Sequence, residues 1–187
     1  MRLIQRGSRG PTEADDPPLD FQAFVAASGA RLFRSACLLT GGDTHAAEDL
    51  VQETFGLLYR RWQRIGRLDN PVGYAQTTLV NRFVSGRRKR SSTELPAGAG
   101  GLGGVADRPE PDRGDDVALR LALLAALRSL PPVDRAVLVL RFWEDLTVAE
   151  TAARLNLSDT AVRSRCSRAL ARVRDRLGGD FADLARS

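Results

Sequence analysis

The sequence is poor in the residues that usually bind metals or carry out acid–base catalysis. Its 187 residues include two cysteines, Cys37 and Cys166, and a single histidine, His45. No Cys or His spacing typical of a metal site is present, and the glycines at 98–104 lack the Gly-Lys-Ser/Thr of a phosphate-binding loop. We therefore expect no metal, no cofactor and no catalytic residue, and an enzyme acting on nucleic acid is the weakest alternative.

Long apolar runs and aromatic residues are also scarce. No run approaches a membrane span, and residues 1–18 lack an apolar segment of signal-peptide length, so we expect a cytoplasmic protein without membrane insertion. Aromatic residues make up 6% of the chain and hydrophobic residues 43%, which favours helices packed through Leu, Val and Ala. The two cysteines fall on apolar helical faces and are interpreted as reduced core residues, with a redox pair as the alternative.

Lysine is almost absent, because Lys89 is the single exception among the 28 basic residues. The net charge of +5 and the isoelectric point near 10.2 are therefore carried by arginine, which binds phosphate and guanine with two hydrogen bonds. A polyanionic partner is favoured, although a GC-rich genome would produce the same arginine bias.

The stretch from Leu146 to Leu177 has the pattern of a short helix, a three-residue turn and a longer helix rich in arginine. The second helix carries one apolar stripe at spacings of three and four, formed by Val162, Cys166, Ala169, Leu170, Val173 and Leu177. Ser158 occupies the N-cap position, and Asn156 suits a left-handed turn. This pattern is typical of a helix-turn-helix, whose second helix enters a DNA major groove. A helical hairpin with a solvated basic face is the alternative.

The first half predicts helices at about 21–39 and 44–65, separated by Gly41-Gly42 and a capping Asp43. The second of these carries Glu48, Asp49, Gln52 and Glu53 in its first half and Arg60, Arg61 and Arg64 in its second. This order suits the helix macrodipole. It equally describes an acidic patch for a basic protein partner beside a basic end for nucleic acid.

A further helix begins at Asn70-Pro71 and ends in Arg87-Arg88-Lys89-Arg90. Together with Trp62 and Tyr74, its basic end is typical of a surface that follows a nucleic-acid backbone and stacks exposed bases. Both aromatic residues are equally well explained as core residues.

The chain is predicted to be all-α, with two small helical domains joined by a flexible linker. The domains span 19–90 and 116–178, the linker rich in Gly, Pro and acidic residues spans 91–115, and tails occupy 1–18 and 179–187. Each domain is small, so its stability without a partner should be modest.

Two motifs resemble those of extracytoplasmic-function sigma factors of the sigma-70 family. AEDLVQETF at 47–55 resembles the helix that grips the clamp of core RNA polymerase, and LPPVDRAVLVLRFWEDLTVAETAARLNLSDTAVRSRCSRALARVR at 130–174 resembles the domain that reads the promoter −35 element. LLTGG at 38–42 and LVNRFVSGRRKR at 79–90 look most like actinobacterial SigE-like members.

The resemblance implies roles for individual residues. Polymerase would be bound by Asp49, Gln52 and Glu53. The −10 region would be met by Arg60, Arg61, Trp62, Arg64, Arg67, Asp69, Asn70, Arg82, Arg87 and Arg88. The −35 groove would be read by Ser158, Asp159, Thr160, Arg163, Ser164, Arg165 and Arg168. The implied partners are the beta-prime clamp and beta flap of core RNA polymerase, promoter DNA and an anti-sigma factor.

Three positions depart from the family pattern. Thr151 stands where an aliphatic residue is usual, Asn156 where glycine is frequent, and Gly86 where relatives often carry an aromatic residue. A stand-alone helix-turn-helix regulator remains the alternative function. It would have no use for the acidic patch at 49–53, and the chain shows no heptad repeat for dimerisation.

Overall fold

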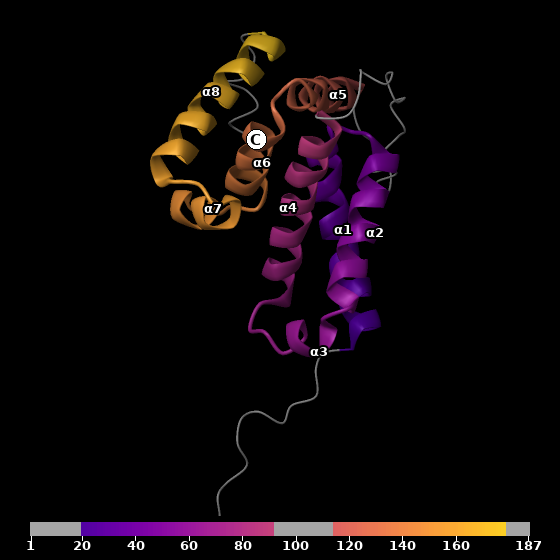
Figure 1. The fold of residues 1–187 in the computed structure, drawn as a ribbon. Helices are drawn as coiled ribbons and strands as arrows, with labels where there is room; N and C mark the ends of the chain where they lie inside the picture. Colours follow the sequence, from indigo (N-terminus) through magenta and orange to yellow (C-terminus); the bar gives the residue numbers. More distant parts are fainter. Residues whose placement is uncertain (1–19, 92–113, 179–187) are drawn as a thin grey trace, which may run out of the picture.

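The computed structural model describes residues 20–91 and 114–178. Every regular element within these two ranges is a helix (Figure 1). The tails predicted at 1–18 and 179–187 lie outside the described residues, as does most of the predicted linker. The all-α fold class is confirmed.

The first helical unit, which we call the N-unit, contains α1 (Phe21–Thr40), α2 (Thr44–Tyr59), α3 (Trp62–Ile65) and α4 (Pro71–Ser91). The predicted break between α1 and α2 is confirmed. Gly41 ends α1 with φ 70°, and the Asp43 side chain accepts a hydrogen bond from the backbone N–H of Ala46 at the start of α2.

The second helical unit, the C-unit, contains α5 (Gly114–Arg128), α6 (Pro132–Leu138), the π-helix η1 (Val139–Trp143), α7 (Val148–Leu155) and α8 (Asp159–Leu177). Pro132 sits in the first turn of α6, where its missing N–H costs no intrahelical hydrogen bond.

The single helix predicted at 44–65 is wrong, because the chain turns at Arg60-Arg61 and divides the segment into α2 and α3. The turn directs Trp62 and Ile65 into the core at 7% and 3% exposure. The Trp62 ring centroid lies 4.7 Å from that of Phe24 and 5.0 Å from that of Phe21, both on α1. These aromatic contacts stabilise α3 against α1, and both side chains stay in the core after the turn.

The two units pack directly against each other, although two domains on a flexible linker were expected. Figure 1 shows α6 beside α4, and α5 across one end of the N-unit. Ala136, Val139 and Leu140 of the C-unit are at most 2% exposed and belong to the same hydrophobic cluster as the α1–α4 core. A unit of this size buries too little apolar surface to be very stable alone. Packing against the other unit therefore adds buried apolar surface to each.

Glycine makes one of these contacts possible. A Cβ at Gly41 would lie 2.6 Å from the Cβ of Arg128 on α5, and the positive φ of Gly41 disfavours any other residue there. The C-terminal end of α1 thus approaches α5 more closely than a side chain would allow.

Arg135 stabilises the same contact between the two units through buried hydrogen bonds. Its side chain is buried, at 3% residue exposure, and its guanidinium donates hydrogen bonds to the backbone oxygens of Leu39 (2.7 Å), Arg128 (2.7 Å) and Leu130 (3.1 Å). It also lies over the Phe83 ring of α4, 5.6 Å from the centroid. The guanidinium of Arg135 on α6 therefore contacts α1, α4 and the end of α5.

Candidate nucleic-acid interface

The helix-turn-helix predicted from the sequence is present as α7, a turn at 156–158, and α8. Asn156 adopts the left-handed conformation at φ 52°, and the Ser158 hydroxyl accepts a hydrogen bond from the Ala161 N–H at 3.2 Å. Both local predictions are confirmed. The small Ala152, at 4% exposure, packs with Val162 and Val137 where the two helices meet.

A capping box begins α7. The Glu150 carboxylate accepts hydrogen bonds from the hydroxyl and the backbone N–H of Thr147, both at 2.7 Å. The side-chain hydrogen bond, followed by the backbone one, lowers the pKa of Glu150 below its ordinary value. Because the pKa of Glu150 is lower in the folded state, its ionised carboxylate stabilises the fold at pH values above the ordinary pKa of the group. This contribution is lost as the pH falls through the folded-state pKa.

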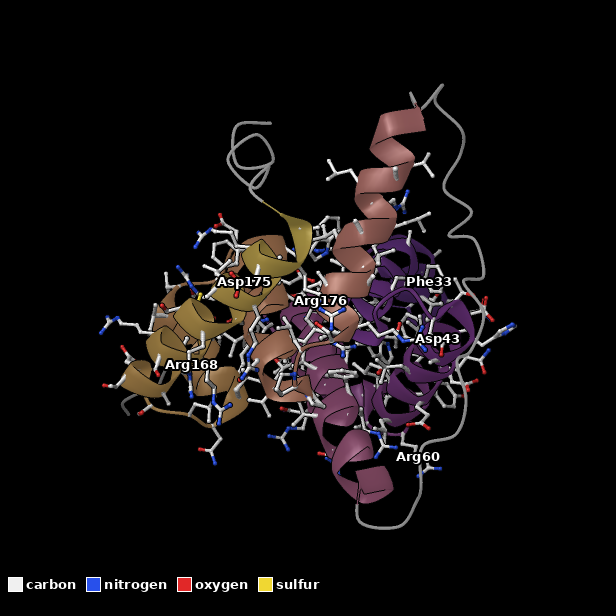
Figure 2. The ribbon with its side chains drawn as sticks, turned by 90° about the horizontal axis from the view of Figure 1, so that it is seen from above. Phe33, Asp43, Arg60, Arg168, Asp175 and Arg176 are labelled. Carbon is white, nitrogen blue, oxygen red and sulfur yellow. The ribbon has the colours of Figure 1, made fainter. Side chains whose placement is uncertain are left out.

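One face of α8 packs against the rest of the C-unit, and the opposite face is exposed to solvent. Val162, Ala169 and Val173 are at most 2% exposed and contact α5, α6 and α7. The exposed residues of the predicted −35 set are Ser158, Asp159, Thr160, Arg163, Ser164 and Arg168. Arg168 lies on the outer side of α8, far from Arg60 of the N-unit (Figure 2).

Arg165 differs from its neighbours on α8. Its guanidinium lies 2.7 Å from a carboxylate oxygen of Asp134, whose side chain is 7% exposed, and Arg172 approaches the other oxygen at 3.7 Å. In this conformation Arg165 therefore neutralises a buried acid of α6, whereas Arg163 and Arg168 ion-pair with no carboxylate among the described residues.

The predicted polymerase-facing residues Asp49, Gln52 and Glu53 are all exposed on α2. Glu53 forms an exposed ion pair with Arg82 of α4 at 2.6 Å. An exposed pair of this kind contributes at most about 1 kcal/mol, so either partner can be recruited by an external ligand.

The turn around α3 exposes six of the ten residues predicted to meet the −10 region, namely Arg60, Arg61, Arg64, Arg67, Asp69 and Asn70. Asn70 also caps α4, since its Oδ1 accepts a hydrogen bond from the Gly73 N–H at 2.7 Å. Arg87 and Arg88 lie in the last turns of α4, and their side chains are outside the described part of the structure.

Trp62 is a core residue in this conformation, packed on Phe21 and Phe24, so its indole is not offered to a base. Two tyrosines are accessible instead. Tyr74 is 40% exposed in the first turns of α4, and Tyr59 is 67% exposed at the end of α2. Tyr59 is absent from the predicted site residues, although it lies outside the apolar stripe of α2, which is formed by Ala47, Leu50, Val51, Phe55 and Leu58.

Both cysteines are free thiols, and burial raises the pKa of Cys37 and of Cys166. They are therefore poor thiolates at neutral pH. Across 20–91 and 114–178 no cluster of His, Cys, Asp and Glu is arranged to hold a metal ion. The same ranges contain no helix with the length and apolar character needed to cross a bilayer.

Family models and known proteins match both units. The sigma-70 region 2 model matches residues 25–93, and the sigma-70 region 4 model matches residues 120–173. RNA polymerase sigma-E factor of Streptomyces coelicolor is 33% identical over 159 residues, which cover 85% of this chain and 86% of the relative. ECF RNA polymerase sigma factor SigE of Mycolicibacterium smegmatis is 35% identical over 161 residues, covering 84% and 61% respectively.

Two solved structures share the fold. The sigma factor RpoE in complex with the anti-sigma factor NepR, from Bartonella quintana, has a TM-score of 0.65 at 24% identity, over 86% of this chain and 98% of that one. CnrH in complex with the cytosolic domain of CnrY has a TM-score of 0.52 at 23% identity, over 82% and 84%.

The exposed helix-turn-helix and the helical unit preceding it define a DNA-binding transcription protein. The chain belongs to the sigma-70 family, in its extracytoplasmic-function group, and is an alternative RNA polymerase sigma factor. The family resemblance seen in the sequence is confirmed.

Proposed function

We propose that the chain directs core RNA polymerase to a set of promoters by recognising a −35 and a −10 element and holding the separated strand. The observation that carries this proposal is the order of the two matched regions on one chain, at 25–93 and 120–173. A stand-alone regulator needs the second region without the first. The chain itself would form and break no covalent bond, because catalysis belongs to the polymerase, and it would act in the cytoplasm with that enzyme.

Within this proposal the domain at 19–90 binds polymerase through Asp49, Gln52 and Glu53 and meets the −10 region around α3 and α4. Exposure of the three polymerase-facing side chains on α2 supports the first assignment. The exposed arginines that surround α3 support the second, since guanidinium groups bind backbone phosphates.

The domain at 116–178 reads the −35 groove with the exposed face of α8. Arg163 and Ser164 stand in the first half of this helix, which is the part that reaches base edges in helix-turn-helix proteins. An anti-sigma factor completes the set of proposed partners. It is supported by analogy with the two solved structures, each of which holds such a protein or a partner domain.

The test is transcription by purified core polymerase on sheared host genomic DNA, with and without this chain, followed by mapping of the 5′ ends. The expected result is a discrete set of new starts that share two spaced motifs. New starts that appear without any shared motif would contradict promoter recognition. Absence of both new starts and co-elution with core polymerase would contradict the whole proposal.

A charge reversal separates polymerase binding from DNA binding. Asp49→Arg should abolish co-elution with core polymerase and leave the fold intact, because Asp49 is exposed. Asp175→Arg, which makes the same charge change at an exposed position of α8, is the matched control and should co-elute normally. Equal behaviour of the two variants would remove Asp49 from the polymerase-binding surface.

A further inference from the structure

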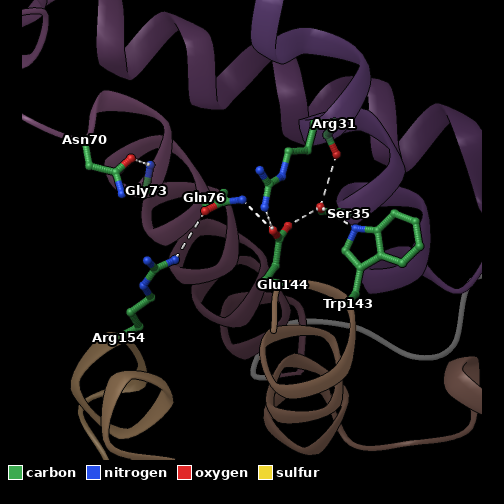
Figure 3. Close-up of polar contacts among 8 residues, drawn as sticks. All are labelled: Arg31, Ser35, Asn70, Gly73, Gln76, Trp143, Glu144 and Arg154. Atoms are coloured by element: carbon green, nitrogen blue, oxygen red, sulfur yellow. Dashed lines mark hydrogen bonds and ion pairs between the residues drawn. The ribbon is translucent and has the colours of Figure 1, made fainter. Parts of the chain in front are cut away.

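The interface between the two units contains a buried carboxylate held by donors from the N-unit (Figure 3). The Glu144 side chain, at the end of η1, is 2% exposed. It accepts hydrogen bonds from Arg31 Nη2 at 2.8 Å, Ser35 Oγ at 2.5 Å and Gln76 Nε2 at 2.5 Å. The three donors come from α1 and α4 and converge on one anionic group of the C-unit.

This group of donors is itself ordered by neighbours. The Gln76 oxygen accepts a hydrogen bond from Arg154 of α7 at 3.4 Å, which leaves the amide nitrogen for Glu144. Trp143 Nε1 donates to Ser35 Oγ at 3.2 Å. Arg31 carries the only formal positive charge that ion-pairs with Glu144 among the described residues, and its side chain remains 51% exposed.

Among the described residues, the hydrogen-bond partners that the donor side chains have outside their own helices belong to the C-unit. Ser35 and Gln76 are 2% and 6% exposed, and their side-chain contacts across the interface are to Trp143, Glu144 and Arg154. If the units separate, Arg31, Ser35 and Gln76 become an accessible site on the N-unit that has lost its anion. A buried ion pair adds little net stability to an interface compared with an apolar contact, so packing alone does not account for the choice of glutamate.

We propose that Arg31, Ser35 and Gln76 form a binding site for a backbone phosphate of DNA, and that Glu144 is an internal competitor occupying it while the two units are packed together. A phosphate offers the same kind of oxygen acceptors as a carboxylate, and the half-exposed guanidinium of Arg31 can reach the larger group. Gln76 lies on α4, the helix that also bears Asn70 at its start and Arg82 further along.

The consequence is coupling between DNA binding and separation of the units. A phosphate and Glu144 cannot occupy the same donors, so DNA that binds at this site favours the separated form, and the packed form weakens DNA binding. This inference rests on the proposed function, because it takes DNA as the ligand.

The experiment measures binding of the full chain to a short fluorescein-labelled DNA duplex of mixed sequence, by anisotropy, from roughly 50 to 200 mM salt. Glu144→Gln keeps the shape of the side chain and removes the competing charge, and should tighten binding by at least about fivefold. Asp145→Asn is the matched control. It makes the same charge change one position away, at an exposed residue with φ 51° that tolerates Asn, and should have little effect.

A second substitution tests whether the donor group receives the phosphate. Arg31→Ala, added to Glu144→Gln, should cancel the gain and reduce the salt slope by about 0.9, as expected for one lost phosphate contact. Arg34→Ala on the same helix, also exposed, should leave the gain in place. Circular dichroism establishes that each variant is folded before its binding is compared.

Each other outcome overturns the inference. Equal gains from Glu144→Gln and Asp145→Asn would reduce the effect to net charge, and a gain that survives Arg31→Ala would mean that the donor group is not the phosphate site. If the wild type binds the duplex and Glu144→Gln binds it no more tightly, this inference is contradicted and the proposed function is not. Failure of every form, wild type included, to bind the duplex would contradict the proposed function as well.

Discussion

Charged side chains serve opposite purposes on two faces of the C-unit. On the face toward the N-unit, Arg135 and Glu144 are buried and hydrogen-bonded to backbone oxygens or to polar side chains of α1 and α4. On the outer face of α8, Arg163 and Arg168 are exposed and ion-pair with no carboxylate of the described ranges. Charge required by the packing is satisfied internally, and charge left on the surface is available to an external anion.

The two faces should therefore respond differently to substitution. Removing one partner from a buried polar contact leaves the other desolvated and unsatisfied, which costs free energy of unfolding. Removing an exposed, unpaired arginine costs almost none, and its effect should appear only when a ligand is added. Substitutions on each face, compared by unfolding and by ligand binding, test this difference.

The largest effect is expected at Arg135. Arg135→Met should lower the free energy of unfolding by about 4 kcal/mol, because it leaves the backbone oxygens of Leu39, Arg128 and Leu130 without their charged donor. Urea unfolding measures the change. Arg172→Met is the control, since this side chain is 54% exposed and should cost less than about 1 kcal/mol. Equal costs would contradict the internal role of Arg135.

The close approach of α1 and α5 is tested at Gly41. Gly41→Ala should cost about 3 kcal/mol, since alanine is strained at φ 70° and its Cβ would meet Arg128. Gly29→Ala, inside α1 with nothing within 4 Å of the new Cβ, should instead stabilise by about 0.5–1 kcal/mol. A cost at Gly41 of only about 1 kcal/mol, the strain of a left-handed alanine alone, would indicate that α5 does not pack there in solution.

The outer face of α8 is tested by comparing two arginines. Arg163→Ala should weaken binding to a promoter duplex about tenfold while the free energy of unfolding changes by less than about 0.5 kcal/mol. Arg165→Ala should also lower stability, because the buried Asp134 loses its nearest cation. Anisotropy titration and urea unfolding of the same preparations give both quantities. A stability loss at Arg163 that matches Arg165 would erase the distinction between the two faces.

The parts of the fold predicted correctly are those that local chemistry determines. Asn156 predicted the left-handed turn, Ser158 the cap of α8, and Gly41-Gly42 with Asp43 the boundary of α1 and α2, because each acts within a few residues of its own position. The assignments of individual residues to polymerase and DNA remain predictions.

The parts that escaped prediction depend on contacts remote in sequence. Glu144 lies 113 residues from Arg31 and 68 from Gln76, and no local pattern signals such a meeting. The turn at Arg60-Arg61 was missed for a different reason. Trp62 and Ile65 remain on the buried side after the turn, so the helical periodicity of the apolar stripe continues across the break.

The smallest effect is expected at Thr151, which is fully buried on α7 and whose hydroxyl has no hydrogen-bond partner in the described part of the structure. Thr151→Val replaces that hydroxyl with a methyl group of similar size and should stabilise the chain by about 1 kcal/mol. Thr54→Val is the matched control. Its buried hydroxyl donates to the Leu50 backbone oxygen at 2.7 Å, so no comparable gain is expected. Unfolding by urea compares the two. Equal changes would mean that the Thr151 hydroxyl is satisfied in solution, and would place this position with the satisfied polar groups of the interior.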